Sequence, residues 1–315
     1  MNLSNPVLAR VQQNVEKVII GREETVQKLL VCLLTGGHVL LEDVPGTGKT
    51  KLARTMSASL SCGFARIQFM PDLLPGDITG MSVYQPKTGE FEFRPGPVFT
   101  NILLADELNR ATPRTQSALL ECMEEHQVTE NGVTRKLEEP FMVIATQNPV
   151  EIQGTFPLPE AQLDRFLMRL SMGYPTRQEA VQMLNRFLSD DPLTELAPAA
   201  EREEILKLRE DVKKVSVSPA VLDYISAIAE GTRRTETVQL GVSPRGMLAL
   251  CHACQAWALM AGRDYVIPDD VKDLAESVLA HRVIVKGMYG RADAGKDVIR
   301  AVLANVPVPT EEARR

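Results

Sequence analysis

The segment EDVPGTGKT contains a glycine-rich loop that ends in a lysine and a threonine. Gly46 and Gly48 would let successive backbone N–H groups turn toward phosphate oxygens, and Lys49 could reach the β- and γ-phosphates of a nucleotide. Thr50 would open the next helix, where its hydroxyl can bind Mg²⁺ while the helix dipole attracts the anion. Taken alone, this short pattern also fits a glycine-rich turn that binds nothing.

The loop departs from the usual G-x-x-x-x-G-K-[ST] pattern at its first position, which is Asp43 instead of glycine. After glycine, Asn and Asp best tolerate left-handed or bridge backbone geometry, so the shape of the loop can be kept. A carboxylate would nevertheless repel phosphates. We therefore expect the Asp43 carboxylate to turn away from them and to accept a hydrogen bond from nearby backbone or a side chain.

Two apolar strands end in polar residues that could complete a nucleotide site. NILLADE ends in Asp106, which could hold Mg²⁺, and in Glu107, which could activate a water for attack on the γ-phosphorus. FMVIATQNP delivers Gln147 and Asn148 to the same edge of the predicted sheet, where an amide could orient that water. The alternatives are a solvated strand end and an Asn-Pro turn.

These segments belong to a regular pattern of short apolar runs separated by helical or loop segments. The runs HVLLE, FARIQF, NILLAD, FMVIAT and FLMRL predict a mostly parallel sheet buried on both faces. A helix is predicted from Arg22 to Leu34, ended by Gly36-Gly37, and another opens at Thr112-Pro113 and runs to about His126. MSVYQPKTGEFEFR and VTENGVTRKL predict two β-hairpins.

After Gly173 the strand runs largely stop and helical periods follow. They span residues 176–188, 200–213, 218–231, 245–262 and 269–281. The chain therefore reads as an α/β domain followed by a helical domain. Its length of 315 residues also favours two domains, at roughly 150 residues each.

Composition excludes several classes of function. Acidic residues outnumber basic ones, 41 to 35, so no overall basic field draws in nucleic acid.

The first ten residues do not look like a secretory signal, and the longest apolar run falls short of the ~20 residues that span a bilayer. We expect a cytoplasmic protein without a membrane span. The five cysteines fit reduced thiols, and the Cys251/Cys254 pair lacks the second pair that a zinc site needs.

The ordered set EDVPGTGKT, LLADELNRA, IATQNPVEIQGTFPLPEAQLDRF and VSPRG closely resembles the AAA+ ATPases of the MoxR group. The resemblance extends from about Val18 to about Arg282. It implies an αβα nucleotide-binding domain over residues 1–173, with a parallel sheet and a β-hairpin insert, and an α-helical lid domain over residues 174–315. It also implies ATP and Mg²⁺ as cofactors and a hexameric ring with ATP bound between subunits.

The resemblance assigns roles to residues of this chain. Those implied for nucleotide binding are Pro45, Gly46, Thr47, Gly48, Lys49, Thr50 and Lys51 in the P-loop and Ile19, Ile20 and Gly21 on the adenine side. Those implied for metal binding are Thr50 and Asp106. Those implied for catalysis are Glu107 as the base, Asn148 as sensor 1, Arg165 as the arginine finger and Arg245 as sensor 2. Arg110 and Arg114 compete with Arg165 for the finger.

The MoxR resemblance implies a remodelling ATPase that acts as a chaperone in the maturation of protein complexes or in metal-cofactor insertion. A von Willebrand factor A-domain protein and a client complex are the implied partners. Two alternatives stay open, a nucleic-acid motor of the helicase type and the motor subunit of a metal chelatase. The hairpin insert does not favour the first, because its few basic residues are balanced by acidic ones.

Overall fold

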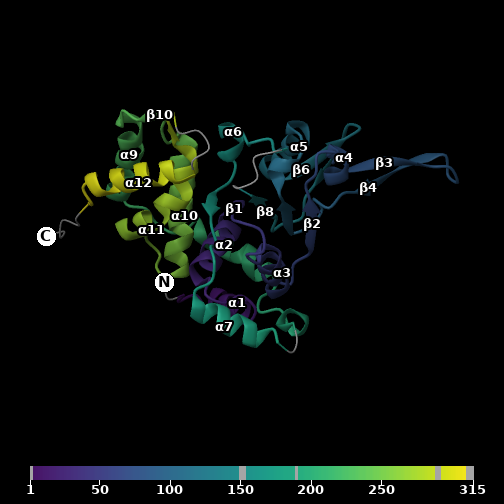
Figure 1. The fold of residues 1–315 in the computed structure, drawn as a ribbon, viewed down its shortest axis with the longest axis horizontal. Helices are drawn as coiled ribbons and strands as arrows, with labels where there is room; N and C mark the ends of the chain where they lie inside the picture. Colours follow the sequence, from purple (N-terminus) through teal and green to yellow (C-terminus); the bar gives the residue numbers. More distant parts are fainter. Residues whose placement is uncertain (1–2, 149–153, 189–190, 288–291, 310–315) are drawn as a thin grey trace.

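The computed structural model describes residues 3–148, 154–188, 191–287 and 292–309 (Figure 1). Its centre is a five-stranded sheet in the order β2-β5-β8-β1-β9, in which all neighbouring strands are parallel. The strands are β1 (Val39–Glu42), β2 (Phe64–Gln68), β5 (Ile102–Asp106), β8 (Met142–Gln147) and β9 (Met168–Leu170). Each matches one apolar run, so the predicted parallel sheet is confirmed.

Both faces of this sheet are buried because successive strand residues point to opposite sides. Leu41 and Leu104 join an apolar cluster with three helices of the α/β part and with later helices of the chain, while Leu40 and Leu103 join another cluster with two helices. The helices of the first face are α1 (Pro6–Glu16), α2 (Glu23–Thr35) and α3 (Lys49–Ser59). Those of the second are α4 (Pro75–Thr79) and α5 (Pro113–Glu125). The predicted helices α2 and α5 are confirmed.

Two β-hairpins are inserted between elements of the sheet, as predicted. They are β3 (Gly80–Gln85) with β4 (Glu90–Pro95) and β6 (Gln127–Glu130) with β7 (Val133–Lys136). Figure 1 shows β3 and β4 projecting from the body of the molecule. At their base, Gly80 has φ +90°, and a Cβ there would lie 2.3 Å from the carbonyl oxygen of Arg94. Only glycine fits this position.

The chain after Gly173 is mainly helical. The helices are α7 (Arg177–Arg186), α8 (Arg202–Val212), α9 (Pro219–Arg234), α10 (Pro244–Met260), α11 (Pro268–Leu279) and α12 (Ala292–Asn305). The first five match the predicted helical segments, whereas α12 and α1 were not predicted. The remaining short elements are α6 (Glu160–Leu163), β10 (Val238–Leu240), β11 (Ile284–Val285) and the 3-10 helices η1 (Leu108–Arg110), η2 (Pro192–Glu195) and η3 (Ala280–Arg282).

The first part of this helical region packs on the α/β part, with α7 lying beside α1 (Figure 1). Asn14 donates to the carbonyl of Ala197 at 2.9 Å, and the N–H of Ala199 donates to Ser59 at 2.9 Å. Helices α8, α10 and α11 bury apolar side chains in the same cluster as α2. The domain division at Gly173 stays a prediction. Among the described residues, none of the helices is both long and apolar enough to cross a bilayer.

Candidate nucleotide-binding site

The P-loop lies between the end of β1 and the start of α3. Gly46 and Gly48 have φ values of +84° and +90°, the left-handed region that favours glycine. No atom lies within 4 Å of the position a Cβ would take at either glycine. A phosphate group can therefore approach this backbone closely, and the amino terminus of α3 at Lys49 points its unpaired N–H groups toward the loop.

Asp43 turns away from the loop, as the sequence analysis predicts. Its carboxylate is nearly buried, with 6% of the residue exposed, and accepts three hydrogen bonds from the segment after β9. The donors are the Ser171 hydroxyl at 2.7 Å, the Met172 N–H at 2.6 Å and the Gly173 N–H at 3.0 Å. Asp43 thus binds the end of β9 to the P-loop strand, while its carbonyl accepts a bond from the Lys49 ammonium at 2.8 Å.

Asp106 ends β5 with both carboxylate oxygens in contact with neighbouring strands. The Thr146 hydroxyl of β8 donates to Oδ1 at 2.7 Å. The Arg66 guanidinium of β2 donates to Oδ2 at 2.7 and 3.2 Å. The carboxylate is therefore fixed at the carboxyl edge of the sheet, the edge at which all five parallel strands end.

Glu107 follows Asp106 with a left-handed backbone, φ +57°, which redirects its side chain away from the strand. Its N–H donates to the Thr146 hydroxyl at 2.9 Å. Its carboxylate accepts bonds from Gln68 at 2.7 Å and from Arg110 at 3.1 Å. Gln68 was not predicted as a site residue, although it ends a predicted strand. Its role depends on β2 lying next to β5, and strand order cannot be read from the run alone.

The strand order brings the predicted sensor Asn148 to the same edge. Gln147, the last residue of β8, pairs in register with Glu42 of β1. Asn148 is the next residue of the chain, so it lies at the level at which the P-loop begins after β1. Because β8 lies between β5 and β1, the polar residues at the ends of three adjacent strands converge there. Residues 149–153, which the resemblance also covers, lie outside the described part of the chain.

The predicted adenine-side residues pack against the start of the helical region. Ile19 is buried, and Gly21, at φ +68°, lies so close to Glu179 that a Cβ would approach its Oε1 to 2.0 Å. Arg22 donates to the Gly173 carbonyl at 3.1 Å. Ile20 is half-buried beside them.

The Lys51 side chain points away from the P-loop. Its ammonium lies 3.0 Å from a carboxylate oxygen of Asp191 and 4.0 Å from the centre of the Phe187 ring. The Lys51 ammonium therefore contacts the helical region and not the P-loop. Pro45 and Thr47 complete the loop, and the Thr47 hydroxyl donates to the Val44 carbonyl at 3.4 Å.

Arg165 lies at the opposite edge of the sheet, the amino edge, where the strands begin. Met168, three residues further on, pairs with Val39 at the start of β1, and the N–H of Leu167 donates to the His38 carbonyl at 2.8 Å. At about 3.3 Å per residue, the stretch from His38 to the P-loop spans about 16 Å. Arg165 is therefore separated from its own P-loop by the length of β1.

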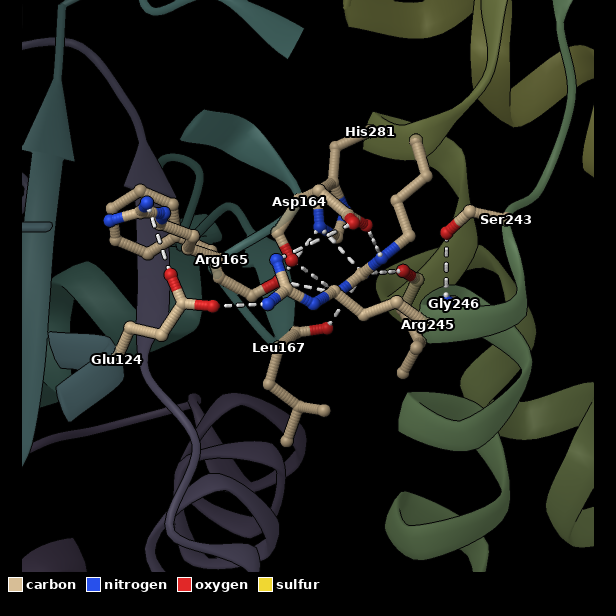
Figure 2. Close-up of polar contacts among 11 residues, drawn as sticks. Glu124, Asp164, Arg165, Leu167, Ser243, Arg245, Gly246 and His281 are labelled. Atoms are coloured by element: carbon tan, nitrogen blue, oxygen red, sulfur yellow. Dashed lines mark hydrogen bonds and ion pairs between the residues drawn. The ribbon is translucent and has the colours of Figure 1, made fainter. Parts of the chain in front are cut away.

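Arg245 lies beside Arg165 (Figure 2). Both guanidinium groups contact the carboxylate of Glu124, Arg165 at 3.0 Å and Arg245 through a hydrogen bond. Glu124 is at the end of α5, and the preceding carbonyl, of Met123, is bonded by the His38 ring at 3.0 Å. The predicted finger and the predicted sensor 2 thus form one group at the amino edge, together with a carboxylate that the sequence analysis missed.

The competing arginines lie elsewhere. Arg110 contacts Glu107 of its own chain at 3.1 Å, so it belongs to the carboxyl edge. Arg114 is exposed in the first turn of α5, which begins shortly after β5 ends. Neither lies beside Arg245.

His38 links the amino edge to α5 and is expected to make the fold sensitive to acid. The N–H of Val143 donates to Nδ1 at 3.0 Å, so Nε2 carries the proton that is donated to Met123. Burial lowers the pKa of His38 to about 4 and lowers that of His281 well below its ordinary value. The His38 ring is therefore neutral in the folded chain above about pH 4, and the His281 ring stays neutral well below the ordinary pKa of histidine.

We expect the free energy of unfolding to fall as pH drops from about 6.5 toward 4. Unfolded histidines bind protons in this range and the buried ones do not, a difference of about 1.4 kcal/mol per pH unit for each histidine. Urea unfolding of wild type and His38→Gln at several pH values measures the effect, and the variant should show a shallower slope. His252→Gln, at an exposed position of α10, is the matched control. Equal slopes for wild type and His38→Gln would contradict the assignment.

Comparison with known proteins identifies the class first. The model of the "ATPase family associated with various cellular activities (AAA)" matches residues 38–168, from the start of β1 to the start of β9. The model of the AAA lid domain matches residues 230–302, from the end of α9 into α12. The fold is that of an AAA+ ATPase, with a parallel central sheet and a helical lid domain.

Similar individual proteins then show the family within this class. Protein YeaC of Bacillus subtilis is 47% identical, over 98% of this chain and 97% of that protein. Chaperone MoxR1 of Mycobacterium tuberculosis is 40% identical, over 97% of this chain and 83% of that protein. A crystal structure from Cytophaga hutchinsonii, described as that of a candidate ATPase, has a TM-score of 0.88 and 37% identity, over 96% of this chain and 95% of that one. The chain belongs to the MoxR family of AAA+ ATPases.

Proposed function

We propose that the chain binds ATP at the carboxyl edge of its sheet and hydrolyses it to ADP and phosphate. The observation that carries the proposal is the convergence of Lys49, Asp106, Glu107 and Asn148 at the ends of the adjacent strands β5, β8 and β1. Membership of the AAA+ class supports it. Phosphoryl transfer is catalysed mainly by positioning and by neutralising charge, which these fixed side chains can supply.

Each residue has a distinct role in this proposal. Lys49 exchanges its hydrogen bond to the Asp43 carbonyl for one to a phosphate oxygen. Glu107 takes a proton from the attacking water, because its carboxylate is held in place by Gln68 at 2.7 Å. Asn148 orients that water through its amide.

Thr50 and Asp106 fit a magnesium site. Mg²⁺ is usually held by one or two carboxylates together with substrate phosphates, and it keeps several waters. The described residues contain no group of three or more His, Cys, Asp or Glu side chains that could hold a metal. Because substrate phosphates supply part of the coordination of Mg²⁺, the ion is expected to bind together with the nucleotide. When bound, it neutralises charge on the phosphates.

The amino-edge arginines support a shared site between subunits. We propose that Arg165 and Arg245 of one subunit reach the ATP of its neighbour, because β1 separates them from their own P-loop. Head-to-tail contacts of this kind close into rings, and we propose the hexameric ring that the family resemblance implies. Hydrolysis would then depend on assembly.

We further propose that the ring works in the cytoplasm as a chaperone, remodelling a client complex together with a von Willebrand factor A-domain protein. The printed name of the relative MoxR1 supports the chaperone class. Maturation or metal-cofactor insertion is the proposed task. A Glu107→Gln protein with ATP should retain these partners on a column, whereas Lys49→Ala should not. Equal retention by both variants would argue against ATP-driven remodelling.

ATP hydrolysis by the purified chain with Mg²⁺ tests the central proposal. Specific activity should rise with protein concentration as subunits assemble. Lys49→Ala should weaken ATP affinity about 10- to 100-fold, because a hydrogen bond to a charged group is worth about 1.5–3 kcal/mol. Calorimetric titration with a non-hydrolysable ATP analogue measures this loss. Absence of hydrolysis across the whole concentration range would overturn the proposal.

A further inference from the structure

The carboxylate of Glu124 joins two arginines that come from distant parts of the chain. Its Oε2 lies 3.0 Å from Nη2 of Arg165, in the turn after α6, and its Oε1 accepts a hydrogen bond from Nη2 of Arg245, in the first turn of α10. Each oxygen thus holds one guanidinium group (Figure 2). A guanidinium has five N–H donors, so both arginines keep donors for a further anion.

The backbone around this group is firmly held. Arg282, nearly buried with 3% of its side chain exposed, donates to the carboxylate of Asp164 at 2.7 Å and to the carbonyls of Asp164 and Phe166 at 3.1 and 2.8 Å. Asp164 also lies 4.0 Å from Nη1 of Arg245. The turn that carries Arg165 is therefore attached to the lid by a buried charge pair.

The tips of the group remain open to solvent. The exposed side-chain fractions are 35% for Glu124, 30% for Arg165 and 52% for Arg245. The two guanidinium groups are held on a fixed backbone, share one carboxylate and direct some of their N–H donors to solvent. They can therefore bind an anion on another molecule. Without Glu124 the two arginines would repel each other and sample many rotamers.

We propose that Glu124 is a positioning residue that holds Arg165 and Arg245 as a spaced pair for the ATP of the neighbouring subunit. This inference rests on the proposed function, in which these arginines act across the subunit interface. Glu124 does not touch the reacting atoms. It fixes the spacing of the two groups that do, so that little side-chain ordering is left for the moment of reaction.

The first test compares Glu124→Ala with wild type in steady-state ATP hydrolysis. We expect kcat to fall about 10- to 100-fold, the scale on which misplaced groups slow catalysis, while KM for ATP stays within about twofold. Glu124→Asp should recover part of the rate because it keeps the charge. Glu125→Gln, at the next and exposed position of α5, is the matched control and should match wild type. A raised kcat in Glu124→Ala would overturn the inference, since Glu124 would then restrain the arginines.

The second test locates the defect. Glu124→Ala subunits keep an intact P-loop, and Lys49→Ala subunits keep an intact arginine pair. Each head-to-tail interface joins the P-loop of one subunit to the arginine pair of the next. In an equal mixture of the two variants, half of the P-loops and half of the arginine pairs are intact. About a quarter of the interfaces should therefore regain an active site. If Glu124→Ala changes the size of the assembly in sedimentation, Glu124→Gln, which keeps the shape and loses the charge, replaces it in both tests.

The mixtures also separate this inference from the proposed function. Arg165→Ala mixed with Lys49→Ala should recover activity in the same way. Recovery there, without recovery for Glu124→Ala, would overturn the role of Glu124 and leave the shared site standing. Failure of both mixtures would overturn the shared site and the inference with it.

Discussion

Replacing Arg165 with alanine should leave ATP binding near the wild-type level and slow hydrolysis about 10³- to 10⁵-fold, the range that an arginine finger supplies. The structure gives the physical reason. Arg165 lies at the amino edge of the sheet beside Arg245, about 16 Å along β1 from its own P-loop. It can therefore stabilise charge on a neighbour's γ-phosphate and not on its own.

Single-turnover hydrolysis, with ATP affinity measured separately, checks this expectation. Arg234→Ala is the matched control, because Arg234 of α9 is an exposed arginine that likewise pairs with a carboxylate, Glu230, at 2.5 Å. Arg114→Ala tests the competing finger in the same assay. Near wild-type turnover in Arg165→Ala would remove the finger role from this residue.

Much of the fold could be predicted because its signals are local. Short apolar runs predicted all five strands of the sheet, and Asn131-Gly132 predicted a hairpin whose two turn residues have φ values of +51° and +77°. Helix α1 was missed although its signal is present. Asn5 caps it by accepting bonds from two backbone N–H groups, and Pro6 occupies the first helical position.

The residues proposed for the carboxyl edge could be named in advance because parallel strands share an edge. Asp106 ends a predicted strand, and Glu107 and Asn148 directly follow one, so their positions in the motifs were enough to predict that they lie close together. The carboxylate of Asp43 could also be oriented in advance, from its charge alone. Its partners at the end of β9 could not be named.

The group formed by Glu124, Arg165 and Arg245 at the amino edge could not be predicted from the sequence. Glu124 is one of many acidic residues on a helix, and nothing in its neighbours marks it. Its importance depends on where α5 ends relative to the turn that carries Arg165 and to the lid helix that carries Arg245. Those three segments are far apart in the chain, and only tertiary packing brings them to one carboxylate. The role of Gln68 could not be predicted for the same reason, because its contact with Glu107 depends on tertiary packing.

Glu107→Gln should bind ATP normally and lose hydrolysis by about 10²- to 10⁴-fold, the usual contribution of a general base. Glutamine keeps the shape of the side chain and one oxygen that can accept the bond from Gln68, so the site should stay folded. It cannot accept a proton from water. The loss should therefore appear in kcat, with little change in ATP affinity.

Rapid mixing of enzyme with limiting ATP measures the chemical step of Glu107→Gln directly. Glu138→Gln is the control, because Glu138 is an exposed glutamate that pairs with Arg202 at 2.8 Å, after the β6–β7 hairpin and before the start of β8. Normal hydrolysis by Glu107→Gln would show that another group activates the water. Loss of ATP binding together with hydrolysis would instead place Glu107 in substrate binding. Tight binding without turnover is the result that makes this residue the base.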